Sequence, residues 1–416
     1  MKKSLENYTG ANRLDNVCFS AIRVVLDRAA ALRSEGHRVI PLSAGEPNFN
    51  TPEPIKQATI QAIENNFTHY GSNRGLPRLR EILADSVKEE LGVSYNPATE
   101  ILITCGGAEA LNNAVLSIVD EGDEVIIFTP SFVTYQNLVE MCSGICVNLP
   151  LRPENGFQID LKELEAAITH RTKLIILNNP NNPTGAVYSR ESLEGMCKLA
   201  REHDLFVLSD EMYSKLLYEG REFCSVVSFP GMKERTILVN GFSKTYAMTG
   251  WRVGYILADE KLLTPIMKVH QYSSTCCPTF IHVGLADSMM LPKTQKCVEE
   301  MVEEFSVRRQ LLLAGLDQIP KLSYVKPYGA FYVMVDVSAT GLTGQEFASR
   351  LLEEKYVATV PAVALGKECV DFVRISYAAG RDDIRDGLEK IAEFVKELEG
   401  ADVKTNNTVD IVRRFL

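Results

Sequence analysis

The sequence predicts an α/β fold, with a large domain built on a mainly parallel seven-stranded sheet covered by helices and a smaller α+β domain built from both chain ends. Three observations indicate this architecture. At 416 residues, the chain exceeds the usual size of one compact core. From about residue 100, short runs that are apolar throughout alternate with helical segments, which is typical of parallel strands buried on both faces. Beyond residue 290, strands alternate with fewer helices, as in α+β domains.

The N-terminal segment, residues 1–44, is expected to form an arm and a helix that belong to the small domain. Apolar residues recur at helical spacing between residues 17 and 35 and stop at Gly36, which predicts an amphipathic helix that ends at a glycine. A short apolar strand is expected at residues 39–42. The apolar face of this N-terminal helix is then expected to pack against the small domain.

The large domain is expected to span residues 45–290. It opens with a loop rich in Gly, Pro and Asn, followed by helices near 54–65 and 76–91. The seven expected strands of its sheet are the apolar runs at 101–105, 124–128, 145–149, 173–179, 205–210, 235–240 and 253–257.

The small domain is expected to span residues 291–400 and to begin with a long charged helix over 294–315. Residues 401–416 are polar before they are apolar, which predicts a loosely held tail or a partner contact. The other expected elements are strands in LSYV, GAFYVMVDV, YVATV and FVRISY and helices at 344–354 and 381–399.

Composition excludes several classes of protein. A net charge of −10 provides no electrostatic footprint for nucleic acid. Residues 1–20 lack the apolar stretch of a signal peptide and no run of 18 apolar residues occurs, so we expect a cytoplasmic protein without a membrane partner. The ten cysteines show no C-x-x-C spacing, which indicates free thiols and makes a metal site unexpected.

Ligands of open parallel sheets bind at the carboxyl ends of the strands, so the residues that follow each strand are the candidates for a site. Gly107 and Ala108 follow the first strand and begin a helix, where backbone N–H groups can bind an anion; a plain turn is the alternative. Asn182 lies between prolines in NNPNNPTG, either in a simple turn or as a preorganised hydrogen-bond donor.

Asp210 ends an apolar strand, where a carboxylate needs a cationic partner. A protonated ring nitrogen would be such a partner, and Tyr213 could reach the same ligand; an ion pair or a helix N-cap is the alternative. Lys244 follows another strand in a polar turn and is a candidate nucleophile, and Arg374 in FVRISY is either a buried structural pair or a bidentate receptor for a carboxylate.

Six segments together resemble the class I, fold type I aminotransferases that depend on pyridoxal phosphate, most closely the prokaryotic-type aspartate and aromatic subgroup. They are SAGEPNFNTPEPI, YGSNRGLPRLR, NNPNNPTG, SDEMY, GFSKTYAMTGWRVGY and FVRISYA, and the resemblance covers roughly residues 17–399. It implies transamination between an L-amino acid and a 2-oxo acid by a ping-pong mechanism. It also implies a homodimer with shared active sites.

The resemblance assigns a role to each candidate residue. Lys244 matches the Schiff-base lysine and the proton carrier, Asp210 the partner of the pyridine nitrogen, and Arg374, with Gly45 and Asn182, the substrate-binding set. The remaining matches are to the cofactor: Asn182 and Tyr213 at the phenolic oxygen, Ser243, Arg252, Gly107 and Ala108 at the phosphate, Phe132 stacked on the ring, and Tyr70 lent by the neighbouring subunit to the phosphate.

One position departs from the pattern. Members that act on dicarboxylates often carry a lysine after the two glycines, where this chain has Ala108, so aromatic or other neutral amino acids are expected ahead of aspartate. Two alternatives remain at this point. A C–S β-lyase would share the lysine, the aspartate and the phosphate site, and a non-catalytic regulator would need a DNA-binding segment for which the chain offers little room.

Overall fold

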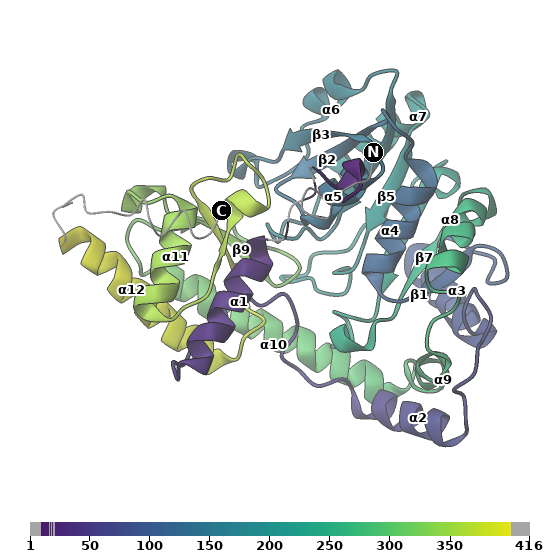
Figure 1. Ribbon diagram of the computed structural model, residues 1–416, viewed down its shortest axis with the longest axis horizontal. Coiled ribbons are helices and arrows are strands. Elements are labelled where there is room, and N and C mark those ends of the chain that lie inside the picture. Colours follow the sequence, from purple (N-terminus) through teal and green to yellow (C-terminus); the bar gives the residue numbers. More distant parts are fainter. Residues whose placement is uncertain (1–9, 16, 18, 20, 401–416) are drawn as a thin grey trace, which may run out of the picture.

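The computed structural model describes residues 10–15, 17, 19 and 21–400, and the predicted tail 401–416 lies outside them. Two sheets organise the chain (Figure 1). The larger has seven strands in the order β1-β7-β6-β5-β4-β2-β3, and the smaller has four in the order β10-β11-β9-β8. The expected α/β fold class is confirmed.

The seven strands of the large sheet coincide with the seven predicted apolar runs. Strands β2 to β6 pair in parallel, whereas β7 runs antiparallel to both β1 and β6. Their bounds are β1 (Ile101–Thr104), β2 (Glu124–Thr129), β3 (Ile145–Pro150), β4 (Thr172–Asn178), β5 (Phe206–Asp210), β6 (Thr236–Gly241) and β7 (Gly254–Leu257).

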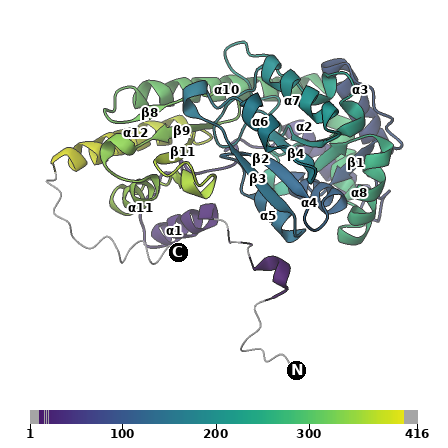
Figure 2. The ribbon, with the colours of Figure 1, turned by 90° about the horizontal axis from the view of Figure 1, so that it is seen from above.

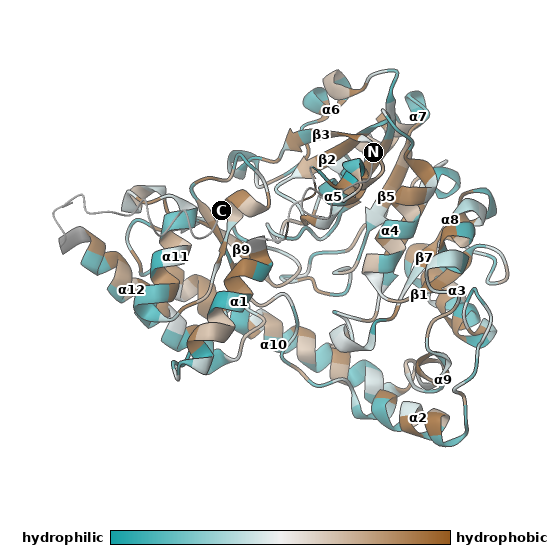
Figure 3. Ribbon diagram, in the orientation of Figure 1, coloured by the Kyte–Doolittle hydropathy of each residue, from teal (hydrophilic) through white to brown (hydrophobic). Residues whose placement is uncertain are grey.

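Both faces of the large sheet are buried except at the partly exposed edge strand β3, because alternate side chains of the inner strands enter different cores. On one face Val125 and Ile127 pack with α4 (Gly107–Ile118), α5 (Thr134–Met141) and α8 (Glu260–Ser273). On the other face Ile126 packs with α7 (Arg190–Glu202), and Ile103 packs with α3 (Pro77–Leu91) and α9 (Thr279–Ser288). Figure 3 shows the apolar strands enclosed by helices with hydrophilic outer faces.

The small sheet is antiparallel throughout. Its strands are β8 (Ser323–Tyr324), β9 (Tyr332–Asp336), β10 (Val360–Pro361) and β11 (Phe372–Ser376), so β8 and β10 are shorter than the expected apolar runs. Helices α11 (Gly344–Lys355) and α12 (Arg381–Gly400) cover it, and side chains such as Phe347 and Phe394 join its core.

The N-terminal segment packs with the small sheet. Ala29 and Leu32 of α1 (Ala21–Ser34) share a core with Leu352 of α11, and Figures 1 and 2 both show α1 beside α11. The strand expected at 39–42 is wrong: the segment makes a single bridge, from Ile40 to Val357. Pro41 follows directly, and its lack of an N–H group prevents a longer ladder.

Helix α10 (Pro292–Leu316) belongs to both parts of the molecule. Its Val298 packs in a core of the large sheet, whereas Phe305 and Leu312 pack in the core of the small one. Figure 2 shows this helix running along one side of both sheets. The division at residues 44, 290 and 400 stays a prediction. Among the described residues, no helix is both long enough and apolar enough to cross a membrane.

Candidate active site

A cavity of about 310 Å³ lies between the carboxyl ends of the large sheet and the small sheet. Eleven of the twelve predicted site residues line it: Gly45, Gly107, Ala108, Phe132, Asn182, Asp210, Tyr213, Ser243, Lys244, Arg252 and Arg374. A larger cavity of about 510 Å³ is lined by Gly241, Phe242, Thr245 and Tyr246, which flank Lys244 in the sequence, and by fifteen other residues, none of them a predicted site residue.

Lys244 follows β6 in the turn that the sequence predicts. Its Nζ donates a hydrogen bond to the carbonyl oxygen of Gly45 at 2.5 Å, which joins the large sheet to the loop before α2 (Glu53–Glu64). Burial lowers the pKa of the lysine to about 8. The amine therefore has a substantial neutral fraction near neutral pH, as a nucleophile or general base requires.

Asp210 is the last residue of β5, and its carboxylate is buried. The Tyr135 hydroxyl donates to Oδ2 at 2.7 Å, and the backbone N–H of Met212 donates to Oδ1 at 3.1 Å. Burial raises the pKa of Asp210, while these two hydrogen bonds and the charge of Lys244 lower it. The carboxylate is thus oriented at the floor of the cavity, and no cationic side chain among the described residues forms an ion pair with it.

The adjacent Glu211 does not share the site. Its Oε1 accepts hydrogen bonds from the hydroxyls of Ser209 at 2.9 Å and Ser225 at 2.5 Å. Burial raises the pKa of Glu211 to about 8. Because successive side chains of a strand alternate between faces, only one of the two acids in SDEMY reaches the cavity.

Arg374 crosses from the small sheet to the large one. Its Nη1 donates to Oδ1 of Asn182 at 3.0 Å, and its Nη2 donates to the carbonyl oxygen of Ser43 at 3.1 Å. Nε is buried and has no hydrogen-bond partner in the part of the chain that the structure describes, and the guanidinium lies 4.4 Å from the ring centroid of Tyr332. Both partners of the Nη atoms are neutral oxygens, so the geometry favours a carboxylate receptor over a structural ion pair.

The loop after β1 packs closely against the side chains of Arg252 and Met212. Gly106 has a φ of 84°, and α4 begins at Gly107. A Cβ on Gly106 would lie 2.6 Å from Nη2 of Arg252, and a Cβ on Gly107 would lie 2.6 Å from Cε of Met212. Glycine is required at Gly106, because its φ is positive and the backbone meets the guanidinium there, whereas a side chain on Gly107 would displace the end of Met212. Ser243 is buried at the same end of the cavity.

Two aromatic residues complete the predicted set within the cavity. The Tyr213 and Tyr332 hydroxyls lie 3.1 Å apart, and burial raises the pKa of Tyr213 well above its usual range, so its hydroxyl stays protonated. Phe132 packs edge-on against Tyr135, with ring centroids 5.8 Å apart. Their rings form an apolar wall beside Asp210.

Tyr70 is the predicted residue that the structure does not bring to this cavity. Its side chain is 89% exposed, and it lines a separate surface pocket with Cys276, Cys277 and Thr279. Within one chain, Tyr70 therefore has no role at the site.

Sequence reasoning missed several residues of the site. Tyr135 lies one helical turn after Phe132, which is the signal that could have identified it. Asn178 ends β4; its Oδ1 accepts from the Asn182 backbone N–H at 2.7 Å, and its Nδ2 donates to the Asp210 carbonyl at 3.0 Å. The other missed lining residues are Tyr332, Thr249 and the apolar Ile22, Leu26, Leu111 and Met212.

Comparisons with known proteins show similarity over most of the chain. The sequence profile of the family described as "Aminotransferase class I and II" matches residues 37–391. The aspartate aminotransferase of Pyrococcus abyssi is 40% identical, over 93% of this chain and 98% of its own. Aromatic-amino-acid aminotransferase 2 of Thermococcus litoralis is 38% identical, over 93% and 98%. The solved structure of Thermus thermophilus aspartate aminotransferase with maleate superposes with a TM-score of 0.88 at 38% identity, covering 93% and 99%.

The chain therefore belongs to the class I and II aminotransferase family. It is an enzyme that transfers amino groups, and the expected fold, family and activity are confirmed. Because these relatives are named aminotransferases, the comparisons do not favour the lyase alternative.

Proposed function

We propose that this enzyme uses pyridoxal 5′-phosphate to exchange the amino group of a neutral L-amino acid, aromatic above all, with a 2-oxo acid, in two ping-pong half-reactions. One observation carries the proposal. Lys244 and Asp210 of the large sheet and Arg374 of the small sheet converge on one cavity, although 34 residues separate the first two and 130 separate Lys244 from Arg374 (244 − 210 and 374 − 244).

The residues present fit a phosphorylated pyridine aldehyde. The Gly107 and Ala108 amides, Ser243 and Arg252 would hold the phosphate where a Cβ on Gly106 or Gly107 would collide. Asp210 would accept the hydrogen bond of the ring nitrogen, and the Phe132 ring would stack on the pyridine. Bound there, the group supplies an aldehyde for covalent capture of an amine and a ring that withdraws electrons from Cα.

Lys244 would carry the proton. Burial favours its neutral amine, which can take the Cα proton of a bound amino acid in one half-reaction. In the other half-reaction it can supply a proton to Cα of the second substrate. The hydroxyl of Tyr213 and the side-chain amide of Asn182 would donate to the phenolic oxygen of the cofactor. These groups come from turns that buried strands hold in place, so the proton path is preorganised.

Arg374 would bind the substrate α-carboxylate. Its guanidinium is oriented by Asn182 Oδ1 and the Ser43 carbonyl, which leaves further N–H groups for a carboxylate. Gly45 lies at the same wall of the cavity. Lys244 donates to its carbonyl at 2.5 Å, so the carboxylate and the proton carrier would face the same Cα.

The pocket for the substrate side chain supports a neutral donor. Apolar side chains contribute much of the lining: Ile22, Leu26, Leu111, Phe132 and Met212. Among the described residues that line the cavity, the cations are Lys244, Arg252 and Arg374, each of which has a role elsewhere in the proposal. Ala108 stands where a lysine would assist a distal carboxylate.

We further propose that the enzyme is a homodimer, in which Tyr70 of each chain reaches the phosphate of the other. The exposure of Tyr70 and its position away from the cavity of its own chain support this arrangement.

The donor preference is directly measurable. With pyridoxal phosphate and 2-oxoglutarate present, kcat/KM for phenylalanine should exceed that for aspartate by about 5- to 150-fold. A second carboxylate left unpaired in this pocket costs about 1–3 kcal/mol or more. The assay follows the formation of each 2-oxo acid across a panel of donors and acceptors.

The same assay separates transamination from elimination. After the first turnover, product should form only when a 2-oxo acid acceptor is present. Continued pyruvate release from a cysteine conjugate without an acceptor would contradict the proposed reaction, and a preference for aspartate would contradict the proposed donor.

Tyr135→Phe should move the acid limb of the pH profile of kcat/KM upward by about one to two pH units. The lost hydrogen bond to a charged group is worth about 1.5–3 kcal/mol. Burial raises the pKa of Asp210 and the Tyr135 hydroxyl lowers it, so without the hydroxyl the pKa rises further and the carboxylate is protonated at higher pH. The profile is measured between pH 5 and about 9.

Tyr188→Phe is the matched control, because Tyr188 is also buried but does not line the cavity. Its acid limb should coincide with that of the wild type. An unmoved limb in Tyr135→Phe would limit Tyr135 to a packing role.

A further inference from the structure

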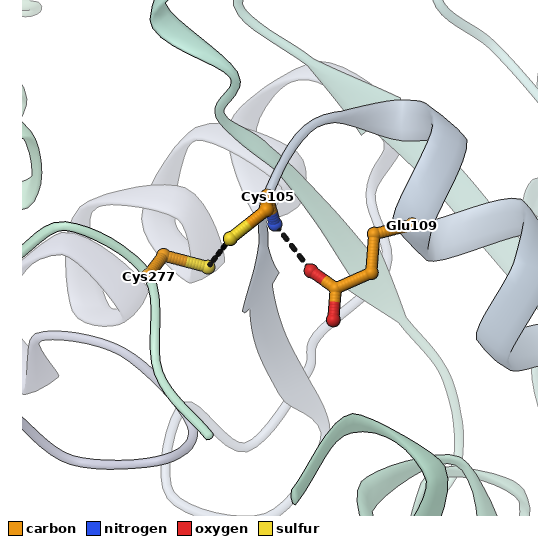
Figure 4. Close-up of side chains that lie close together, drawn as sticks. All are labelled: Cys105, Glu109 and Cys277. Carbon is orange, nitrogen blue, oxygen red and sulfur yellow. Dashed lines mark hydrogen bonds between the residues drawn. The ribbon is translucent and has the colours of Figure 1, made fainter. Parts of the chain in front are cut away.

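Two thiols, those of Cys105 and Cys277, lie close together (Figure 4). Cys105 adjoins the loop after β1 that is proposed to hold the phosphate, Gly106 to Ala108, which is called the phosphate loop below. Cys105 follows β1, Cys277 lies two residues before α9, and their Sγ atoms are 3.2 Å apart, although 172 residues separate them in the sequence. Cys105 is partly exposed and Cys277 is buried. Neither lines the active-site cavity, and the proposed mechanism uses neither.

Two other half-buried thiols, Cys146 and Cys224, have different surroundings. The Cys146 thiol donates to the Gln136 carbonyl at 3.7 Å, and Cys224 accepts from Arg190 at 3.8 Å. A disulfide has its sulfurs about 2.05 Å apart, so the Cys105 and Cys277 thiols need to approach by roughly 1 Å to bond. The fold therefore places two distant thiols within reach of oxidation.

We propose that Cys105 and Cys277 form a reversible disulfide when they meet a low-molecular-weight disulfide, and that this bond weakens cofactor binding in the adjacent phosphate loop. The part that concerns the cofactor rests on the proposed function; the disulfide does not. The site is one of covalent modification, and in the structure as it stands both thiols are free.

Cys105 is the attacking thiol. It is the more exposed of the two, and the hydrogen bond with Cys277 lowers its pKa, which favours the reactive thiolate. Its sulfur attacks one sulfur of the small disulfide RSSR and displaces RS⁻. The Cys277 sulfur then attacks Sγ of Cys105 and displaces the second RS⁻. The two thiol protons leave with the products, so the protein loses two hydrogens and RSSR becomes two RSH.

A metal ion is the other ligand that two thiols and a carboxylate could bind, since a Glu109 oxygen lies within 4.8 Å of both sulfurs. Glu109 is already engaged, however. Its Oε2 accepts from the Cys105 backbone N–H, and its Oε1 accepts from Asn113 Nδ2 at 3.0 Å and contacts His270 Nδ1 at 2.8 Å. Both oxygens of this carboxylate are already engaged, which makes it a poorer third ligand, so the geometry favours the dithiol.

The pair adjoins the proposed phosphate site through the backbone. Cys105 directly precedes Gly106, where even a Cβ would lie 2.6 Å from Arg252 Nη2. Such close packing cannot absorb a movement of roughly 1 Å at Cys105. Drawing Cys105 toward Cys277 therefore displaces the Gly106 and Gly107 peptides relative to Arg252.

The other thiol adjoins the segment that carries Tyr70. Asn73 Nδ2 donates to the Thr275 carbonyl at 2.8 Å, and the Thr279 hydroxyl donates to the His69 carbonyl at 2.8 Å. Oxidation therefore acts on both elements that the proposal places at a phosphate: the loop of the same chain and, through Tyr70, the site of the partner.

The test compares reduced holoenzyme with holoenzyme treated with oxidised glutathione. The oxidised protein should lose the mass of two hydrogens, and peptide mapping should show a link between Cys105 and Cys277. Its dissociation constant for pyridoxal phosphate should rise by about 5- to 150-fold, the usual range of coupling between two sites. Dithiothreitol should restore the original value.

Variants locate the effect. Cys105→Ser and Cys277→Ala should lose both the link and the change in affinity, whereas Cys276→Ser, which alters the neighbouring thiol, should retain both. A link through Cys276, no link at all, or a mapped link with unchanged affinity would overturn the proposal. So would a stoichiometric zinc ion that the reduced protein keeps through desalting and Cys105→Ser loses.

The measurements distinguish a failure of the proposed function from a failure of the proposed disulfide. If reduced protein bound no pyridoxal phosphate, the proposed function would be refuted, and a mapped link between Cys105 and Cys277 would still support the dithiol. If reduced protein bound it normally and no link formed, only the dithiol would be refuted.

Discussion

Lys244→Ala is expected to reduce turnover by about 10⁴-fold or more, because the variant lacks both the general base and the amine that attaches the cofactor. The far-UV circular dichroism should be unchanged, since Lys244 sits in a turn and its amine makes a single hydrogen bond to the Gly45 carbonyl. Borohydride reduction of the wild-type holoenzyme should add a pyridoxyl group to the peptide that contains Lys244, and the same treatment should leave that peptide of the variant unmodified.

Lys215→Ala is the control for a nearby lysine. Lys215 pairs with Glu90 at 2.6 Å and does not line the active-site cavity, so its loss should change kcat by about twofold or less. A pyridoxyl group on another lysine, or turnover retained by Lys244→Ala, would remove Lys244 from the mechanism.

Arg374→Ala is expected to lower kcat/KM for amino acids by about 30- to 5,000-fold, which corresponds to about 2–5 kcal/mol for one partner of a buried charge pair. The guanidinium is buried, and the substrate carboxylate would lose its bidentate partner. Steady-state kinetics with the preferred donor measure the loss.

A substrate without the carboxylate distinguishes binding from structural damage. The amine that corresponds to the preferred amino acid should react with Arg374→Ala about as slowly as with the wild type, because neither enzyme gains from the clamp. Arg374→Lys keeps the charge but not the planar fork and should recover only part of the loss. Equal kinetic constants for wild type and Arg374→Ala would rule out Arg374 as the receptor of the substrate carboxylate.

Most of the large sheet could be predicted from the sequence, because its strands are buried on both faces and carry uninterrupted apolar runs such as ILITC and LFVLSD. The site residues that follow these strands were predictable for the same reason: strand ends of a parallel sheet share one edge. Eleven of the twelve predicted residues do line one cavity.

The contacts between distant segments could not be predicted in this way. Tyr135 reaches Asp210 across 75 residues, and Tyr332 reaches Tyr213 across 119, and no local spacing encodes either contact. Ile22 and Leu26 enter the cavity only because α1 packs against α11, so their role depends on tertiary packing. The pairing of Cys105 with Cys277 is invisible to spacing rules for the same reason.

The placement of the two sheets has a consequence for how such an enzyme can diversify. Asp210 ends one strand of the large sheet and Lys244 follows another, whereas Arg374 lies on the small sheet and Ile22 and Leu26 lie on α1, which packs against α11. Substitutions of Ile22 and Leu26 can therefore reshape one wall of the substrate pocket while the residues that move the proton stay fixed on the large sheet. Relatives with the same fold can differ in donor without rebuilding their chemistry, and directed evolution of this enzyme toward new amines should begin at Ile22 and Leu26.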